Sequence, residues 1–223
     1  MGRFIQYLNE LSSRWGRGIT FVDIDNTLFK TFASIFVLKN GKVVKKFSNQ
    51  EYNTYKLQPG ESFNFDEFRD ASMFHDTSEP ILPTINRIKR MFKNIDYRES
   101  KVVLLTARTR FKDMKKFKDT FKKVGLPIDK IDVEFSPEGV DNVSAQKKKT
   151  IMGYLETGEY RRVRLIDDDI TNIKKFLSIK DTVPQDVLDK VREKHKIPDG
   201  ENFPIISFYG LLVLPDGRVK EIK

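Results

Sequence analysis

The sequence has no cysteine, which excludes both a disulfide framework and a metal site built from thiolates. It has no internal repeat, no P-loop pattern for phosphates and no low-complexity tract. The N-terminal segment lacks the long apolar core of a signal peptide, and no apolar run is long enough to cross a membrane. These absences favour a cytoplasmic protein that does not enter a membrane.

The composition is that of a folded domain with an excess of positive charge. Of 223 residues, 39% are hydrophobic and 12% aromatic, which favours one globular domain with an insertion. The 41 Lys and Arg residues outnumber the 32 Asp and Glu residues, which gives a net charge of +9. This balance attracts polyanions such as nucleotides or nucleic acids, although lysines on helix faces, as in residues 112–123, also serve solubility alone.

The segment Ile19–Phe29 organises the rest of the chain. An apolar, β-prone run ends in Asp23 and Asp25, and Thr27 follows two residues later. Because side chains alternate along a strand, the two carboxylates point the same way, and they repel unless a cation lies between them or one holds a proton. Open α/β sheets bind ligands at the carboxyl ends of their strands. The segment therefore predicts a site for a hard cation with a carboxylate nucleophile beside it.

A second apolar strand, Lys101–Arg108, ends in the hydroxyl group of Thr106. The backbone N–H groups that follow, beginning at Ala107, lie at the start of the next predicted helix, where the helix dipole favours anions. The guanidinium of Arg108 suits bidentate binding of a phosphate. An apolar strand that closes on Thr is common in proteins of every function, so this pattern gains weight only from its order after the Asp23–Asp25 segment.

Two charged clusters follow further along the chain. Adjacent lysines occupy the first turn of a predicted helix, which is an unfavourable place for cations in a purely structural role. Helical phase favours Lys148 as the one that faces the sheet, with Lys147 and Lys149 as alternatives. A strand over Arg161–Ile166 then ends in Asp167–Asp169, whose charges repel one another unless a cation offsets them.

Asp23-Ile24-Asp25-Asn26-Thr27 resembles the first motif, DxDx(T/V), of the haloacid dehalogenase (HAD) superfamily, most of whose members are phosphatases. The strand that closes on Thr106 resembles the second motif, and the lysine cluster resembles the third. The segment Asp167–Asn172 resembles the fourth motif in its DDxxxN form. All four occur in the family's order over most of the chain, and the one departure in the first motif is Asn26, where Gly is commoner.

The resemblance implies an aspartyl-phosphate mechanism with Mg²⁺ as the cofactor. Asp23 would be the nucleophile and Asp25 the general acid and base. Thr106 would orient the phosphoryl group and the lysine, Lys148 by preference, would neutralise it. The substrate-binding residues implied are Thr27, Ala107 and Arg108. The metal ligands implied are Asp23, Asp25 through its backbone carbonyl, Asp167 and Asp168, and an all-oxygen set of this kind suits magnesium better than zinc.

The resemblance also implies an α/β fold, a three-layer Rossmann-like (HAD-like) sandwich with a mostly parallel central sheet and a β-hairpin flap. We expect a single HAD-like domain over residues 1–223, with a flap or small cap over 30–76 and a C-terminal helix and hairpin extension over 181–223. Asn40-Gly41 is a favoured turn pair and predicts the hairpin. Helices are expected over residues 4–15 and 109–124, and others are expected to begin at Ser78–Pro80 and at Ser144.

The predicted function is a Mg²⁺-dependent phosphohydrolase that acts on a phosphomonoester. The substrate would be a phosphorylated molecule, and a nucleotide or nucleic acid is compatible with the basic surface and the aromatic residues of the insertion. One alternative is a 3′-phosphatase that processes nucleic-acid ends, similar to the phosphatase halves of polynucleotide kinases. A second alternative is a non-catalytic HAD-like scaffold that binds a partner or a nucleic acid.

Overall fold

The computed structural model describes residues 16–48, 51, 55–93, 100–137, 142–198, 200 and 203–223. The helix expected over residues 4–15 lies outside these residues. The described chain is an α/β structure built on a six-stranded sheet in the order β11-β10-β9-β1-β7-β8, in which only β11 runs antiparallel. The strands are β1 Gly18–Val22, β7 Lys101–Thr106, β8 Asp132–Phe135, β9 Arg162–Asp167, β10 Ser207–Val213 and β11 Val219–Ile222.

The order of the strands reverses beside β1. From β1 the chain moves outward to β7 and β8, and it then returns to the other side of β1 to form β9 and β10. The prediction of a mostly parallel central sheet is confirmed, and this layout is compatible with a Rossmann-like fold. In such sheets the reversal opens a crevice at the carboxyl ends of the two strands concerned, here β1 and β9.

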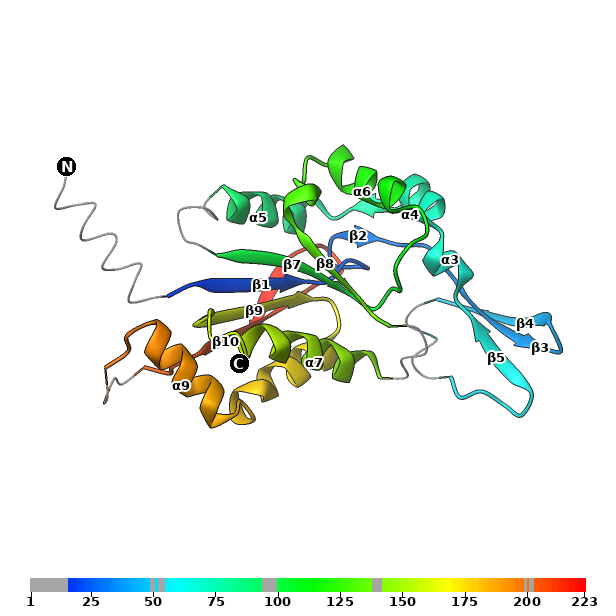
Figure 1. Ribbon diagram of the computed structural model, residues 1–223. Helices are drawn as coiled ribbons and strands as arrows, with labels where there is room; N and C mark the ends of the chain where they lie inside the picture. The colour runs from blue at the N-terminus through cyan, green and yellow to red at the C-terminus, as the bar shows by residue number, and fades with distance from the viewer. Residues whose placement is uncertain are drawn as a thin grey trace.

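Helices cover both faces of the sheet and make a layer on each side (Figure 1). One layer contains α4 Ala71–Thr77, α5 Leu82–Phe92 and α6 Met114–Lys123, and the other contains α7 Val143–Leu155, α8 Ile170–Leu177 and α9 Gln185–Lys194. Short 3₁₀ helices lie at Ile128–Lys130 and Ser178–Asp181. Each layer buries its own apolar cluster against the sheet, with Phe117 and Phe121 on one side and Ile151 and Phe176 on the other.

The expected hairpin is present and belongs to a second, antiparallel sheet in the order β4-β3-β5. Its turn residues Asn40 and Gly41 both have positive φ, 53° and 75°, as a type I′ turn requires. This small sheet projects beyond the carboxyl ends of the central strands (Figure 1). The elements between β1 and α5 are β2 Phe29–Lys30, β3 Ile35–Lys39, β4 Lys42–Phe47, β5 Glu61–Asn64, α3 Asp66–Arg69, α4 and β6 Glu79–Pro80.

Three boundaries differ from the prediction. The helix expected to begin at Ser78–Pro80 begins at Leu82, because Glu79 and Pro80 form β6 and pair with β2. The helix expected from residue 109 begins at Met114, where Asp113 accepts the N-terminal hydrogen bond from the Lys116 N–H. Asn142, rather than Ser144, caps α7.

The C-terminal segment completes the central sheet instead of extending beyond it. Strand β10 pairs in parallel with β9, from Ser207 opposite Arg162 to Leu212 opposite Asp167, and the expected hairpin adds β11 at the edge. Helix α8 packs closely on β10, because a Cβ at Gly210 would lie 2.7 Å from the side chain of Ile173. The tail is therefore part of the sheet that positions the site.

Candidate functional site

The acidic residues of two distant segments meet at the reversal of strand order. Asp23 directly follows β1 and Asp167 ends β9, and these strands are neighbours in parallel register, with Val22 opposite Ile166. The Asp23 N–H donates to the Ile166 carbonyl oxygen at 2.9 Å, which carries the pairing one residue past the end of β1. The prediction that the two acidic segments converge is therefore confirmed.

Three carboxylates form a compact cluster at this place. Oxygen atoms of Asp23, Asp167 and Asp168 all lie within 4.8 Å of one another. Asp23 is 5% exposed and Asp167 is fully buried, whereas Asp168 is partly exposed. So many buried negative charges require a compensating cation, because burial and mutual repulsion both disfavour ionisation.

Lys147, from α7, supplies one positive charge to the cluster. Its Nζ donates to Asp23 Oδ1 and to Asp167 Oδ2, both at 2.7 Å, and the side chain is buried. The preference for Lys148 is wrong, because Lys148 Nζ donates to Thr182 Oγ1 at 3.1 Å on the exterior, and Lys149 is exposed. The spacing of Lys147 from Ile151 and Leu155, four and eight residues away on one buried helix face, was the signal for the correct lysine.

Asp167 is held in place by the start of α8. Asn172 Nδ2 donates to both of its carboxylate oxygens at 3.1 Å, and the Asp169 N–H donates to Oδ1 at 2.9 Å. The amide oxygen of Asn172 accepts from Ser144 Oγ at 2.8 Å, which fixes the orientation of that amide. Asp169 caps α8 as expected, by accepting from the Thr171 N–H. Asn172 therefore positions a carboxylate, a role that its place in the sequence motif does not reveal.

Asp25 lies in a buried ion pair with Arg108 rather than beside the other carboxylates. Arg108 Nη2 donates to Asp25 Oδ1 at 2.6 Å and Nε donates to Oδ2 at 2.8 Å. Thr31 Oγ1 also donates to Asp25 Oδ1, at 2.6 Å, and Arg108 Nη1 donates to the Phe68 carbonyl oxygen at 2.8 Å. Arg108 is 3% exposed, and its guanidinium lies among the rings of Phe68, Phe74 and Phe111.

This pairing changes the interpretation of Arg108. The guanidinium that we expected to bind a phosphate is directed at Asp25 and at the backbone of α3. Sequence reasoning missed the pair, because nothing local links residues that are 83 positions apart. It also missed Thr31, which lies six positions after Asp25 but outside the acidic segment that the motif describes. The only available signal was that Arg108 and Asp25 each follow the carboxyl end of a strand in the same parallel sheet.

The hydroxyl groups of the predicted site are also buried. Thr27 Oγ1 donates to Asp168 Oδ1 at 3.3 Å, so the structure connects Thr27 to the carboxylate cluster. Thr106 ends β7 at 1% exposure, and its Oγ1 accepts from the Arg108 N–H at 3.1 Å. Ala107, the residue after β7, is exposed. The end of β7 therefore has one exposed residue beside a buried hydroxyl group that already accepts one hydrogen bond.

The surroundings of the carboxyl groups shift their pKa values in different directions. Burial raises the pKa of Asp23 well above its ordinary value, helped by the charges of Asp167 and Asp168 and opposed by Lys147. Burial and the charge of Asp167 likewise raise the pKa of Asp168 to about 7. For Asp25, burial acts in the same direction, but the charge and hydrogen bonds of Arg108 outweigh it and lower the pKa. The pKa of Lys147 is raised despite its burial, because Asp167 and Asp23 stabilise the ammonium.

The donor set fits a small divalent cation. The atoms that converge are carboxylate oxygens from Asp23, Asp167 and Asp168, which are the ligands that magnesium prefers. Two of them are buried, and Lys147 offsets only one of the three negative charges. A second cation at the cluster would reduce the repulsion that raises the pKa values of Asp23 and Asp168.

Comparison with family models, curated proteins and solved structures finds no significant match to this chain. The resemblance to the HAD superfamily therefore stays a prediction that depends on the motifs and on the geometry above. Among the helices of the described residues, none has the length and apolar character needed to cross a bilayer.

Proposed function

We propose that the protein is a Mg²⁺-dependent phosphohydrolase of the HAD type that acts on phosphomonoesters through an aspartyl-phosphate. One observation carries the proposal. Lys147 bridges Asp23 and Asp167 at 2.7 Å each, with the Asp168 carboxylate beside them, at the strand reversal where α/β sheets bind ligands. A nucleophilic carboxylate, two further acids and an ammonium at one place are the groups that this chemistry requires.

In the proposed reaction, a carboxylate oxygen of Asp23 attacks phosphorus in line, and the bond from phosphorus to the ester oxygen breaks. The leaving oxygen takes a proton, which the family's mechanism assigns to Asp25. Water then attacks the aspartyl-phosphate and gives up a proton to Asp25, so that inorganic phosphate leaves and the Asp23 carboxylate is restored. Lys147 offsets charge on the transferring phosphoryl group and favours the ionised form of Asp23, against the burial that raises its pKa.

Asp23, Asp167 and Asp168 would hold the magnesium ion, which supplies charge neutralisation at the phosphoryl oxygens when bound. Asn172 and the Asp169 N–H orient Asp167 for this role. Thr106 and the exposed residue Ala107 lie at the end of β7, next to β1, where the Thr106 hydroxyl and the Ala107 N–H would orient phosphoryl oxygens.

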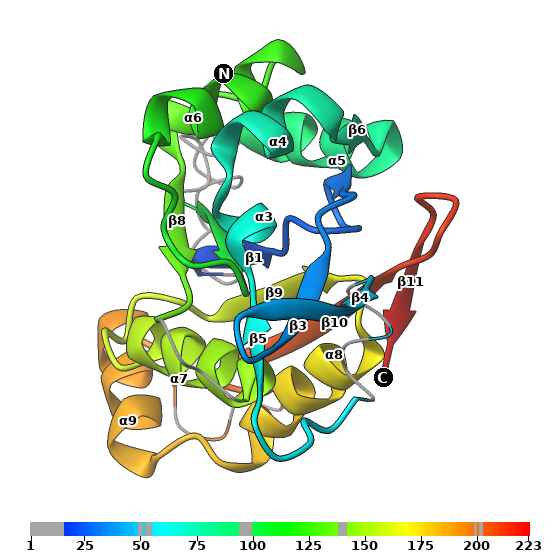
Figure 2. The same ribbon diagram turned by 90° about the vertical axis from the view of Figure 1, so that its right-hand side faces the viewer.

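The small sheet β4-β3-β5, with α3 and α4, would be the flap of the HAD fold. It follows the first acidic segment and projects past the carboxyl ends of the central strands (Figure 2), the ends at which β1 leads into Asp23 and β9 closes on Asp167. Arg108 connects it to the site, because the same guanidinium binds the Phe68 carbonyl oxygen of α3 and the Asp25 carboxylate. In this proposal the insertion limits access of water and selects substrates.

The test is hydrolysis of a generic aryl phosphate with Mg²⁺ by wild-type protein, Asp23→Asn and the matched control Asp129→Asn. Asp129 is an exposed carboxylate that pairs with Lys118 and Lys122 on the surface. We expect EDTA to abolish turnover by the wild type, Asp23→Asn to be inactive while melting as a folded protein, and Asp129→Asn to be unaffected.

Phosphate release by Asp23→Asn at the wild-type rate would refute the assignment of the nucleophile. If no phosphomonoester among nucleotides, sugar phosphates and phosphorylated oligonucleotides is hydrolysed by the wild type, the enzyme proposal fails. The chain would then be better described as a non-catalytic scaffold.

A further inference from the structure

The small sheet β4-β3-β5 and the segments beside it carry much of the positive charge of the chain. Residues 30–64 contain six lysines and two glutamates, a net charge of +4 out of +9 for all 223 residues. The lysines are Lys30, Lys39, Lys42, Lys45, Lys46 and Lys56. Because this short segment holds nearly half of the net charge, it is a local centre of positive potential.

Strand β4 presents its lysines to solvent. Every residue from Lys42 to Lys46 is exposed, and β4 has a neighbouring strand on one side only, β3. Lys39 lies directly opposite Lys42 in the pairing of β3 with β4, so two ammonium groups share the hairpin end of the small sheet. Lys46 lies opposite Phe36, with its Nζ 5.8 Å from the centre of that ring. The lysines therefore line one edge and the tip of the small sheet.

These lysines form no ion pair with a carboxylate within the part of the chain that the structure describes. Lys45 Nζ donates to the phenol oxygen of Tyr55 at 2.8 Å, and that oxygen is a neutral acceptor. Glu61 Oε2 accepts from the Tyr55 hydroxyl group and from the Gln58 N–H instead of from a lysine. The positive charge of the small sheet therefore stays available to an anionic ligand.

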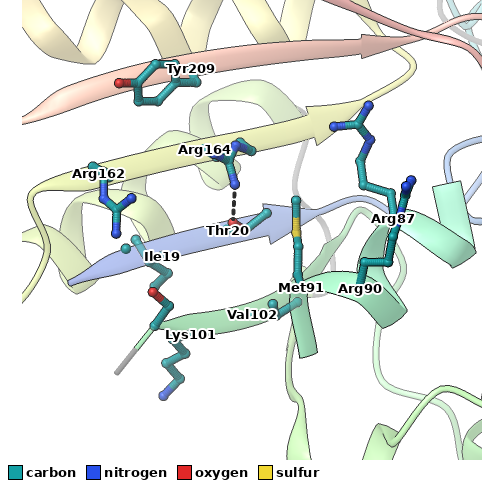
Figure 3. A pocket seen from close by; sticks show the side chains of 12 residues that line it. Ile19, Thr20, Arg87, Arg90, Met91, Lys101, Val102, Arg162, Arg164 and Tyr209 are labelled. Atoms are coloured by element: carbon teal, nitrogen blue, oxygen red, sulfur yellow. Dashed lines mark hydrogen bonds between the residues drawn. The ribbon is translucent and has the colours of Figure 1, made fainter. Parts of the chain in front are cut away.

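Two other cationic regions of the described chain differ in this respect. In the hollow between α5 and the central sheet (Figure 3), Arg164 Nη1 donates to Thr20 Oγ1 at 3.4 Å and Arg162 Nη2 donates to the Gly16 carbonyl oxygen at 3.0 Å. Two lysines of α6 pair with Asp129. Hydrogen bonds within the protein thus occupy these arginines, and a carboxylate offsets these lysines.

The chain between the carboxylate cluster and the small sheet is held at both ends. Thr31 Oγ1 donates to Asp25 Oδ1 at 2.6 Å, and the Ser34 N–H donates to Glu67 Oε2 of α3 at 2.7 Å. Between Thr31 and Ser34 lies Phe32, whose side chain is 53% exposed. The chain thus places an exposed aromatic ring between the candidate site and the strands that carry the lysines.

Protection of a sheet edge explains only part of this pattern. Lysines on an edge strand discourage pairing with other chains, which accounts for those of β4. Protection of the edge does not account for Lys30 and Lys39, which lie on β2 and β3, or for the exposed ring of Phe32. Cations that contact phosphates and aromatic rings that stack on bases are the two elements of surfaces that bind single-stranded nucleic acids.

We propose that the small sheet binds single-stranded nucleic acid and presents its phosphorylated end to the carboxylate cluster. The substrate would be the terminal phosphate of an oligonucleotide, so this inference rests on the proposed function. The lysines of β3 and β4 contact backbone phosphates, and Phe32 stacks on a base near the end. Strand β3 rises about 17 Å over its five residues, so a substrate needs several linked nucleotides to reach the lysines at the tip.

The chemistry of the candidate site favours a nucleic acid over an acidic protein as the ligand. An acidic peptide offers carboxylates to the lysines, but it carries no phosphomonoester for the carboxylate cluster. An oligonucleotide with a terminal phosphate carries both the phosphomonoester and a regular series of further phosphates.

The first experiment compares hydrolysis of oligothymidylates of about ten nucleotides, with a 3′- or a 5′-phosphate, with hydrolysis of the matching mononucleotide. The wild type should prefer one of the oligonucleotides by about tenfold or more in kcat/KM, and the preference should weaken as salt rises. Lys42→Gln/Lys46→Gln should lower kcat/KM for that oligonucleotide about 25-fold at about 0.1 M salt, because two lost phosphate contacts correspond to about 1.4 log units. The change should lie in KM rather than in kcat, since these contacts are remote from the reacting group.

The matched control is Lys174→Gln/Lys175→Gln, which removes the same charge from exposed positions in the last turn of α8. It should lower kcat/KM for the oligonucleotide less than about threefold. Lys42→Arg/Lys46→Arg keeps the charge and should retain the preference for the oligonucleotide. Thermal melting should give the same Tm for all three double variants.

The role of Phe32 is tested with Phe32→Ala beside Phe203→Ala. Phe203 is 70% exposed and precedes β10, on the other side of the chain sequence from the small sheet. Phe32→Ala should lower kcat/KM for the oligonucleotide about tenfold, the effect of losing one base stack. Phe203→Ala should leave this constant unchanged.

Binding is also measured without turnover, by fluorescence anisotropy of a labelled oligothymidylate that lacks a terminal phosphate, in EDTA. Its affinity should fall about 25-fold in Lys42→Gln/Lys46→Gln, and polyglutamate of similar length should compete weakly. Equal losses in the β4 and α8 variants, or tighter binding of polyglutamate than of the oligonucleotide, would overturn the proposal.

The failure of this inference can be told apart from the failure of the proposed function. Hydrolysis of the aryl phosphate and the mononucleotide without preference for an oligonucleotide would refute the inference and leave the phosphohydrolase in place. If no phosphomonoester is hydrolysed, the proposed function and the substrate assignment both fail, and the anisotropy measurement alone decides whether the small sheet binds nucleic acid.

Discussion

Replacing Lys147 with methionine, beside a matched Lys148→Met variant, separates a functional ammonium from an ordinary surface lysine. The two residues are adjacent on α7, but Lys147 is buried against two carboxylates whereas Lys148 contacts Thr182 on the exterior. Methionine keeps the length and apolar stem of lysine, so both substitutions conserve packing and remove only the charge. Differences between the variants therefore report the environment of the ammonium.

The magnitude follows from the burial of the partners. Removing Lys147 leaves Asp23, Asp167 and Asp168 within 4.8 Å of one another without their closest cation. Breaking a buried ion pair by removing one partner costs about 3–5 kcal/mol of the free energy of unfolding. For a chain of this size that corresponds to a fall of roughly 6–20 °C in Tm in EDTA. Lys148→Met should change Tm by about 1–2 °C, since exposed lysines contribute about 0.5 kcal/mol.

The assays are thermal melting with EDTA, melting with Mg²⁺, and hydrolysis of an aryl phosphate. Mg²⁺ should restore part of the Tm of Lys147→Met, because a divalent cation offsets the same negative charges. If the proposed function is correct, Lys147→Met should lose about 10²–10³-fold in kcat, the range seen when one preorganised electrostatic group is removed. Equal Tm values for the two variants in EDTA would refute the reasoning about the buried cluster.

Three further predictions concern the acids. Burial raises the folded-state pKa of Asp168 to about 7, so the contribution of this group to stability is fully present below the unfolded value near 4 and is lost as pH rises through about 7. A metal ion that replaces the proton should therefore raise Tm more at pH 8 than at pH 5.5. Equal increases in Tm at the two pH values would contradict this. Arg108→Met should lower the free energy of unfolding, measured with urea at pH 7, by about 3–5 kcal/mol. This difference in free energy between the variant and the wild type should become smaller as pH falls toward about 4, because protonated Asp25 needs no cation. Asp25→Asn should slow hydrolysis of alkyl phosphates far more than that of aryl phosphates, measured as the ratio of kcat values.

The meeting of the acidic segments could be predicted because it follows from sheet topology. Asp23 and Asp167 each end an apolar run, and the carboxyl ends of neighbouring parallel strands lie at one edge of a sheet. The hairpin in the C-terminal segment was also predicted, but the apolar sequence of β10, which is typical of a buried parallel strand, was not recognised as a neighbour of β9. Features that follow from the periodicity of apolar residues and from the residues at strand ends could therefore be predicted from the sequence.

The choice among the lysines and the Asp25–Arg108 pair was not visible in the same way. Adjacent positions on a helix differ by about 100° in direction, so the face that meets the sheet decides between Lys147 and Lys148. The pairing of Asp25 with Arg108 depends on the docking of β7 beside β1 and on the position of Phe68 in the insertion. Strand β6 consists of two residues and exists only because β2 lies beside it, so local propensity gives no signal for it.

Asp25 is the residue whose geometry most constrains the proposed chemistry. A general acid must hold a proton at the start of the reaction, but the charge and hydrogen bonds of Arg108 lower the pKa of Asp25 and keep it ionised. An ionised Asp25 is suited to accept a proton from water in the second step. To donate one in the first step it would have to be released by Arg108, and the bond from that guanidinium to Phe68 links such a release to movement of α3. A leaving group that departs without a proton avoids this requirement, which is why Asp25→Asn should spare aryl phosphates. If Asp25→Asn slows hydrolysis of aryl and alkyl phosphates equally, Asp25 does not transfer a proton. Its role would then be to hold Arg108 and the backbone in position.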